Sequence, residues 1–262
     1  VMVVDESARL RGEYSRLVAD ITDRKVIKQT VMTSVYGVTR TGARAQIQAR
    51  ITEKILSNPS MVMDPEIEKS VFAASMYLAN LTLASLEEMF SGAKDIMDWL
   101  GNCSKLVAAN GHAMSWVSPM GLPIMQPYRQ RATQTVHTTL QSVTLAVADD
   151  ALPVSVRKQR SAFPPNYVHS LDATHMLMTA IRMRDEDLTF ASVHDSYWTH
   201  ACDIPIMSDH IRDCFVDLYD HPVLEDLRQS LSMRYPDIDF PPVPQTGELD
   251  LAEIRGSKYF FH

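Results

Sequence analysis

Arg24, Lys28 and Tyr36 lie in a stretch that contains no proline and that ends at a glycine. Thr22 and Asp23, directly before it, are residue types that cap helix N-termini, so we expect a helix over about residues 23–37. Because each residue of an α-helix turns by about 100°, the two cations and the phenol share one broad face. Such a face could bind a triphosphate with its attached sugar. The alternative is a solvated basic face, with the tyrosine in the core.

His194 and Asp195 are flanked on both sides by apolar and β-prone residues. This pattern predicts a strand–turn–strand unit over about residues 188–200, with the carboxylate at its tip. Mg²⁺ prefers hard oxygen ligands and keeps several waters, so a rigidly held carboxylate suits a metal that also contacts a substrate phosphate. The dipeptide alone is a weak signal.

His169, Asp172 and His175 recur at intervals of three residues in a helix predicted from residue 167 to about 184. Side chains at this spacing stay within reach of one another, which could suggest a metal site. Such triplets more often form a hydrogen-bonded polar edge, and this is the structure that we expect.

In this order and spacing, the motifs resemble those of the single-subunit, phage-type RNA polymerases. The frame Arg24-x3-Lys28-x7-Tyr36-Gly37 is shared with family A DNA polymerases, whereas its Val-Met-Thr filling resembles the RNA polymerase branch. The run Pro-Asn-Tyr-Val-His-Ser-Leu-Asp-x-x-His at 165–175 and the later His-Asp-Ser-Tyr follow in the family's order. The resemblance extends from about residue 23 to the last residue, and the aromatic C-terminus looks most like the mitochondrial members.

The resemblance implies a role for each candidate residue. Arg24 and Lys28 would neutralise the triphosphate, and Lys28 is also a candidate to protonate the leaving pyrophosphate. Tyr36 and His169 would recognise the ribose hydroxyl. Asp195 would bind Mg²⁺ in a two-metal site, so Lys28 and Asp195 are the expected catalytic residues.

The fold implied by the resemblance is α+β and predominantly helical, namely the fingers and the C-terminal palm portion of a right-hand polymerase. The fingers would span residues 1–168 and the palm, with a C-terminal tail, residues 169–262. Apolar residues at helical spacing predict further helices over residues 5–22, 43–56, 67–90 and 95–109.

An inserted β-hairpin is predicted within residues 120–160. Residues 135–147 are rich in β-branched residues and form the first expected strand, Asp149-Asp150 the turn, and residues 153–157 the return strand. Two adjacent prolines predict a break over residues 163–166.

Three bases, Arg157, Lys158 and Arg160, follow the expected return strand. In the family, a hairpin at this point contacts the template duplex, so the resemblance implies nucleic-acid binding here. The alternative is that the three side chains are simply solvated.

Composition bounds these interpretations. The chain has 262 residues, with 45% hydrophobic and 22% charged residues, as in ordinary globular proteins. Its net charge of −7 is unusual for a nucleic-acid enzyme, but bases gather in its first two thirds and acids in residues 203–250. Three cysteines without CxxC spacing argue against a zinc site or a disulfide framework. We find no apolar run of membrane-spanning length and no targeting segment, and the N-terminus reads as the interior of a longer protein.

The activity implied by the resemblance is DNA-templated RNA synthesis, by attack of an RNA 3′-hydroxyl on the α-phosphate of a ribonucleoside triphosphate. Expected partners are the DNA template, nascent RNA, the triphosphates and mitochondrial initiation factors, with the parent protein in the mitochondrial matrix and its transit peptide outside this chain. The family's other metal-binding aspartate is not found before Arg24, so the chain alone is expected to be inactive.

Three alternatives remain open from the sequence. The first is a family A DNA polymerase fragment. The second is a metal-dependent phosphohydrolase that uses His169 or His175 with His194-Asp195, a class that carries its His-Asp pair on a helix. The third is a DNA-binding or scaffold fragment without catalytic function.

Overall fold

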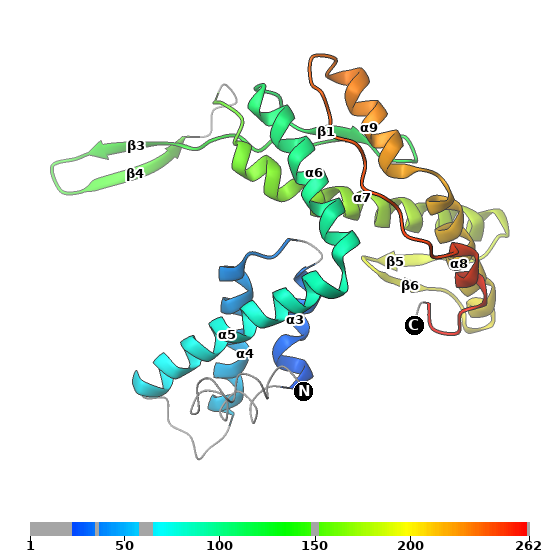
Figure 1. The fold of residues 1–262 in the computed structure, drawn as a ribbon, viewed down its shortest axis with the longest axis horizontal. Coiled ribbons are helices and arrows are strands. Elements are labelled where there is room, and N and C mark those ends of the chain that lie inside the picture. Colours follow the sequence, from blue (N-terminus) through cyan, green and yellow to red (C-terminus); the bar gives the residue numbers. More distant parts are fainter. Residues whose placement is uncertain (1–22, 35–36, 58–64, 148–151, 261–262) are drawn as a thin grey trace. The chain divides into compact units, whose positions relative to one another are not determined.

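The structure is a computed structural model that describes residues 23–34, 37–57, 65–147 and 152–260. The chain forms two compact units, residues 1–95 and 96–262, and the boundary falls inside helix α6 (Ser91–Ala109). The described residues are mostly helical, with three two-stranded antiparallel sheets (Figure 1). The predicted α+β, predominantly helical class is therefore confirmed. The division into fingers and palm at residue 168 stays a prediction.

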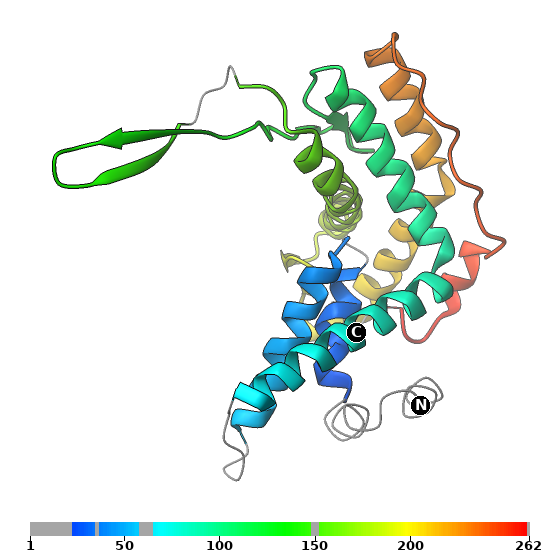
Figure 2. The same ribbon diagram turned by 60° about the vertical axis from the view of Figure 1, so that its left-hand side comes forward.

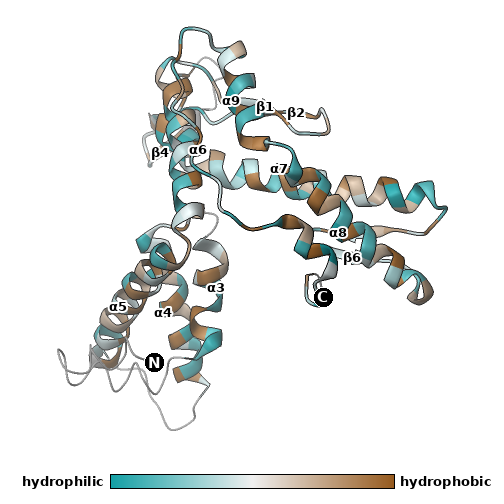
Figure 3. Ribbon diagram, turned by 45° about the vertical axis from the view of Figure 1, so that its right-hand side comes forward, coloured by the Kyte–Doolittle hydropathy of each residue, from teal (hydrophilic) through white to brown (hydrophobic). Residues whose placement is uncertain are grey.

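The first unit packs three helices, α3 (Arg24–Ser34), α4 (Arg40–Leu56) and α5 (Pro65–Met89). The isoleucines predicted to share one face of α4, namely Ile47, Ile51 and Ile55, are all buried. Figure 3 shows hydrophobic and hydrophilic residues alternating along α4 and α5, as expected of helices that bury one face. The rest of the buried core is made by Val26, Ala43, Val71, Ala74, Leu78 and Ala79.

The second unit is built on α6, α7 (Val156–Asp185), α8 (Ile204–Asp220) and α9 (Val223–Arg234). Trp116 lies in its core, where its indole Nε1 donates to Ser170 Oγ at 3.0 Å and its ring packs edge-on against Phe163, with centroids 5.1 Å apart. Short 3₁₀ helices η1 (Ala201–Asp203) and η2 (Leu251–Gly256) complete the unit. The C-terminal third is thus mainly helical, with an irregular proline-containing segment after α9.

Three hairpins interrupt the helices of the second unit. Strand β1 (Ser115–Val117) pairs with β2 (Pro123–Met125), β3 (Ala132–His137) with β4 (Ser142–Val147), and β5 (Ala191–Val193) with β6 (Ser196–Trp198). The ribbon of β3 and β4 extends away from the helices of this unit in both views (Figures 1 and 2).

The hairpin predicted within residues 120–160 exists, but its turn and strands were predicted wrongly. Residues 138–141 form the turn, inside the segment expected to be one strand, and His137 pairs with Ser142. Thr138 explains the turn, because its hydroxyl accepts hydrogen bonds from the backbone N–H groups of Leu140 and Gln141. Asp149-Asp150 lies outside the described residues. The expected return strand is reduced to a single bridge between Arg129 and Val154.

The predicted break at residues 163–166 is also wrong, since α7 runs without interruption from Val156 to Asp185 through Pro164 and Pro165. The two prolines remove two backbone donors from the helix. Burial offsets this loss, because Phe163 is fully buried and its ring contacts Tyr167 at 5.8 Å between centroids.

The remaining element predictions have mixed outcomes. Helices α4 and α5 agree with the predicted bounds to within a few residues, whereas α6 begins at Ser91, four positions before the predicted start. The helix expected over residues 5–22 lies outside the described residues. Of the helices that the structure describes, none is long and apolar enough to cross a membrane.

Candidate functional site

Helix α3 begins where the sequence predicted. The carboxylate of Asp23 accepts hydrogen bonds from the backbone N–H groups of Lys25 (2.9 Å) and Val26 (3.1 Å), so Asp23 is the capping residue. A hydrogen bond from Lys54, followed by the one from the Val26 backbone, lowers the pKa of Asp23 below its ordinary value. The cap therefore stays ionised at neutral pH.

Helix α3 is fixed to α4 by a small polar network. Thr30 is fully buried, and its hydroxyl lies 3.2 Å from Gln46 Oε1. Thr33 Oγ1 donates to the same oxygen at 3.1 Å. Together with the buried Val26, these contacts set which face of α3 is covered and which faces solvent.

Arg24 and Lys28 are both exposed, and so is Met32 one turn later. The two cations therefore occupy the accessible face that the sequence predicted for them. Gly37 follows with φ +74°, a left-handed conformation that glycine adopts without strain. Tyr36 lies outside the described residues, so its expected place beside the nucleotide sugar stays a prediction.

A pocket of about 740 Å³ lies between α3 and α4. Four cationic side chains line it, three of which no motif had singled out. It also contains two carboxylates and several neutral residues. Its lining residues are Asp23, Lys25, Val26, Lys28, Gln29, Met32, Thr33, Arg50, Glu53, Lys54 and Ser57.

His169 and Asp172 stand one turn apart on α7, where His169 Nδ1 lies 3.5 Å from Asp172 Oδ2. His175 is buried, and its Nε2 lies 2.8 Å from the backbone oxygen of Ile211. The three side chains thus do not converge on one point, and His175 is held by α8. Burial lowers the pKa of His175, which keeps its ring neutral at physiological pH.

Asp195 lies at the tip of the β5–β6 hairpin, as the sequence predicted. Val193 pairs with Ser196, so His194 and Asp195 form the two-residue turn, with His194 at φ +55°. Asp195 is exposed. Because the pair lies between strands, the arrangement lacks the helical His-Asp placement that the phosphohydrolase alternative requires.

The negative charge of Asp195 affects the pKa values of neighbouring side chains in the same unit. Burial, with a smaller repulsion from Asp195, raises the pKa of Asp172 above its ordinary value. Burial and the charges of Asp172 and Asp195 raise the pKa of Tyr197 to about 12. Asp172 and Asp195 therefore contribute to one electronegative region.

This region fits a magnesium ion only in part. A Mg²⁺ ion is commonly held by one or two carboxylates, with water and substrate phosphates as its other ligands, and the exposed carboxylate of Asp195 meets that requirement. No group of three or more histidine, cysteine or acidic side chains arranged for a metal occurs in the described ranges. Asp195 would therefore need further ligands for the ion, such as water or the phosphates of a substrate.

Arg157, Lys158 and Arg160 lie in the first turns of α7, not at the end of a hairpin. All three are exposed, whereas Gln159 between them is fully buried. Cations at a helix N-terminus oppose the helix dipole and gain no stabilisation from it. Their nucleic-acid role stays a prediction.

Sequence reasoning missed a buried amide network beside His169. Gln126 Nε2 donates to Gln159 Oε1, and Gln159 Nε2 donates back to the Gln126 backbone oxygen, each at 2.8 Å. Asn166 Nδ2 donates to Gln126 Oε1 at 2.9 Å. A hollow of about 270 Å³ adjoins the network and is also lined by His169. No spacing in the sequence marks glutamines that meet through tertiary packing.

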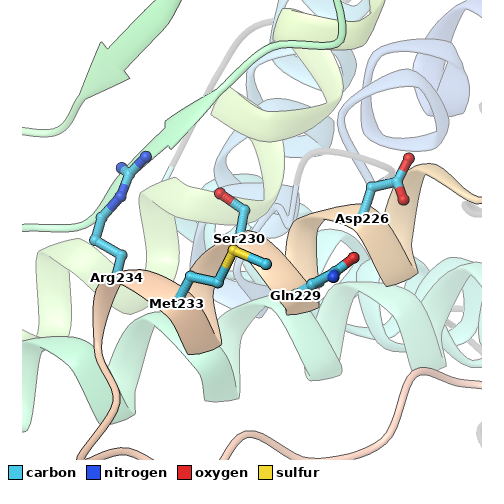
Figure 4. A pocket seen from close by; sticks show the side chains of 5 residues that line it. All are labelled: Asp226, Gln229, Ser230, Met233 and Arg234. Atoms are coloured by element: carbon cyan, nitrogen blue, oxygen red, sulfur yellow. The ribbon is translucent and has the colours of Figure 1, made fainter.

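Another hollow, of about 500 Å³, lies along α9 and is lined by Asp226, Gln229, Ser230, Met233 and Arg234 (Figure 4). Arg234 Nη1 donates to Ser115 Oγ at 2.8 Å and so joins α9 to β1. None of the site residues predicted from the sequence lines this hollow.

Comparison with known proteins identifies the family. The family model described as DNA-dependent RNA polymerase matches residues 2–238. The chain is 49% identical over 248 residues to the mitochondrial DNA-directed RNA polymerase 1B of Nicotiana tabacum, and 48% identical over 248 residues to the chloroplastic DNA-directed RNA polymerase 3 of Nicotiana sylvestris. Each match covers 95% of this chain and 24% of the relative.

A shorter relative is covered more fully. DNA-directed RNA polymerase 2A of Nicotiana tabacum is 45% identical over 248 residues, which are 95% of this chain and 72% of the relative. The chain thus spans about a quarter of the longer relatives and most of this one. With a family model that matches most of its residues, the chain belongs to the DNA-dependent RNA polymerase family.

Proposed function

We propose that this chain forms part of a DNA-directed RNA polymerase, and that the complete enzyme joins ribonucleotides on a DNA template. The observation that carries the proposal is the 45% identity with tobacco polymerase 2A over 72% of that protein. The exposed cations of α3 and the exposed carboxylate of Asp195 support it. The partners would be the DNA template, the nascent RNA and ribonucleoside triphosphates, with initiation factors for the full-length enzyme.

In the proposed reaction, the oxygen of the RNA 3′-hydroxyl attacks the α-phosphorus of the triphosphate. A new phosphorus–oxygen bond forms and the hydroxyl proton passes to water. The bond to the bridging oxygen breaks, and pyrophosphate leaves with the electron pair. Arg24 and Lys28 neutralise the charge that develops on the leaving group, and the Lys28 ammonium gives it a proton. Both side chains are exposed, whereas the opposite face of α3 packs through Val26 against the core formed with α4 and α5. This arrangement supports these roles.

When bound, Mg²⁺ would supply electrostatic stabilisation of the attacking and leaving oxygens. Asp195 is the residue of this chain that we propose to hold it. The family's other metal-binding aspartate is not found before Arg24. The 262-residue chain alone therefore lacks one of the carboxylates that would hold the metal ions. RNA synthesis by the isolated chain would contradict this view.

Sugar recognition is assigned to Tyr36 and His169. A hydrogen bond to the ribose 2′-hydroxyl rejects a substrate without that group, because a polar side chain is then left unpaired. The contact of His169 Nδ1 with Asp172 at 3.5 Å supports a fixed orientation of the imidazole ring.

Nucleic-acid binding is assigned to Arg157, Lys158 and Arg160. All three side chains are exposed at the start of α7, where positive charges are not stabilised by the helix dipole. Their presence there supports contact with a phosphate backbone. The relatives are named mitochondrial and chloroplastic, so we propose that the parent protein acts in an organelle, the mitochondrial matrix in particular.

The experiment is incorporation of ribo- and deoxyribonucleotides by the full-length parent enzyme, unmodified and with Tyr36→Phe. We expect the unmodified enzyme to prefer ribonucleotides and the variant to lose roughly tenfold or more of that preference. A preference for deoxyribonucleotides in the unmodified enzyme would assign the chain to the DNA polymerase branch. Templated incorporation would exclude the scaffold alternative.

A further inference from the structure

We propose that His175 is a positioning residue, which holds the β5–β6 hairpin and the carboxylate of Asp195 in a fixed place relative to α7. The inference rests on the proposed function, because it takes Asp195 to be the residue that holds Mg²⁺. His175 is the third member of the triplet at positions 169, 172 and 175, and the mechanism above gives it no role. Its contacts lead to α8 and to β6.

The His175 ring is oriented by a hydrogen bond to α8. The side chain is buried, and its Nε2 lies 2.8 Å from the backbone oxygen of Ile211. A carbonyl oxygen can only accept, so Nε2 carries a hydrogen and donates it. Burial lowers the pKa of His175, so the ring is neutral and Nε2–H is its one N–H group. The bond therefore fixes both the tautomer and the rotation of the ring.

The oriented ring contacts aromatic side chains of α8 and of the hairpin, which lie side by side in Figures 1 and 3. Its centroid is 5.7 Å from that of Phe215 on α8, edge to face, and 6.5 Å from that of Tyr197 on β6. Aromatic rings attract one another in edge-to-face and tilted arrangements when their centroids lie about 4.5–7 Å apart. His175 thus joins α7 to both elements through directional contacts.

Tyr197 links this support to the tip of the hairpin. It stands two residues after Asp195 and pairs with Ser192 on the opposite strand. Strands of three residues do not hold their own shape in water, so a displaced Tyr197 would also displace the turn that carries Asp195. This matters for Mg²⁺, because the ion demands near-octahedral geometry with ligands at about 2.0–2.1 Å.

The apolar residues around Tyr197 fill space without defining an orientation. Met183, Met207 and Ile211 form the buried part of this cluster. Methionine is unbranched and adapts its shape to its neighbours. The hydrogen-bonded imidazole has one orientation instead, and its bond to the Ile211 backbone offsets the cost of burying a polar ring. The contact with His175 is therefore the part of this core that favours one place for Tyr197.

Helix α7 also carries the proposed sugar contact. His169 precedes His175 by six residues, which corresponds to about 9 Å along the helix axis. A hairpin held on α7 through His175 therefore keeps the carboxylate of Asp195 at a set distance from His169.

The test uses the full-length parent enzyme with three substitutions, after their thermal unfolding midpoints are measured. His175→Phe keeps a ring and removes the donor, whereas His175→Gln keeps an N–H donor at a similar distance from the backbone. Tyr167→Phe is the matched control. It also keeps a buried ring on α7 and loses one hydrogen bond to a backbone oxygen, that of Val223 at 3.0 Å.

The first measurement is hydrogen–deuterium exchange of the backbone amides of residues 191–198 in metal-free buffer. We expect exchange in His175→Phe to be faster by roughly fivefold or more, because the hairpin opens locally when its support is lost. His175→Gln should restore most of the protection. Tyr167→Phe should leave the exchange of these residues unchanged.

The second measurement is the Mg²⁺ dependence of templated RNA synthesis. We expect His175→Phe to lower kcat roughly tenfold and to raise the half-saturating Mg²⁺ concentration roughly threefold, with a change in the KM for ribonucleotides below about twofold. The KM is expected to change least because Arg24 and Lys28, proposed to contact the triphosphate, belong to the other unit. His175→Gln should again lie close to the unmodified enzyme.

Several results would overturn the inference. They are unchanged exchange of the hairpin in His175→Phe, equal losses in His175→Phe and His175→Gln, equally fast exchange in Tyr167→Phe, or fast exchange with an unchanged response to Mg²⁺. If His175→Phe does not fold, His175→Asn takes its place, since its amide is too short to reach the Ile211 oxygen, and the same outcomes decide.

The two proposals can fail separately. Normal templated incorporation together with any of these results would refute the role of His175 alone. No templated incorporation by the unmodified enzyme would refute the proposed function, and the exchange of residues 191–198 would still show whether His175 holds the hairpin.

Discussion

Two hairpins of the second unit, β5–β6 and β3–β4, have the same topology and opposite surroundings. The β5–β6 hairpin has strands of three residues and is backed by a core in which Phe190 and Tyr197 pack beside the buried Met183, Met207 and Ile211. The β3–β4 hairpin has strands of six residues, and its side chains at 133–137 and 142–145 are exposed.

The difference indicates what each hairpin can do. A two-stranded ribbon alone is marginally stable in water, so a hairpin that must hold a carboxylate in place needs a core behind it. Thr199 Oγ1 also donates to the backbone oxygen of Thr189 at 2.7 Å and closes the base of β5–β6. The β3–β4 segment, residues 132–147, contains no lysine, arginine, aspartate or glutamate. Any contact that it makes with a template duplex therefore involves no lysine or arginine side chain.

The largest effect on stability is expected at the support of β5–β6. Tyr197→Ala removes a half-buried ring that contacts Phe190 at 5.3 Å between centroids, and we expect it to destabilise the chain by about 1–3 kcal/mol. Chemical denaturation measures this change. Tyr259→Ala, at a tyrosine that is 82% exposed, is the control and should have little effect. Equal losses in both variants would contradict the idea that the core holds this hairpin.

A much smaller effect is expected in β3–β4. Leu140, in the turn, is 95% exposed, so Leu140→Ser should change the free energy of unfolding by no more than about 0.5 kcal/mol. The same denaturation experiment tests this. Destabilisation as large as that of Tyr197→Ala would show that the hairpin is packed against another part of the protein, and would remove the contrast between the two.

A change of the opposite sign is expected from the charge beside Asp195. The pKa of Asp172 is raised in the folded chain, so its ionisation opposes folding, and stability falls as pH rises from the ordinary carboxyl range through the raised value. Asp172→Asn should therefore stabilise the chain at neutral pH in metal-free buffer, by less than about 1 kcal/mol because the group is partly solvated. The gain should vanish at a pH below both pKa values, and a gain that persists there would have another cause.

The sequence predicted the elements whose local signals agree with their surroundings. The fourfold spacing of Ile47, Ile51 and Ile55 places one face of α4 in the core, and apolar flanks predicted the strands around Asp195. Predictions from local sequence signals were wrong where tertiary packing determined the secondary structure. Pro164 and Pro165 continue a helix because the neighbouring Phe163 is buried, and the turn at residues 138–141 contains neither glycine nor proline.

In the candidate site, too, local sequence signals predicted some residues, whereas tertiary packing brought in others. Motif spacing was enough to single out Arg24 and Lys28 as an exposed pair on one helix. It gave no indication of Arg50 and Lys54 in the adjoining pocket, because these reach it only through the packing of α4 on α3. Residues that meet by tertiary contact leave no regular spacing in the sequence.

We propose that the β5–β6 hairpin presents a catalytic carboxylate, that of Asp195. Asp195→Asn tests it most directly, because the residue is exposed and the change preserves size while it removes the charge. In the full-length parent enzyme, we predict that templated RNA synthesis falls by roughly a hundredfold or more, while the thermal unfolding midpoint is unchanged. An Asp195→Asn enzyme that synthesises RNA within about twofold of the unmodified rate would contradict the claim.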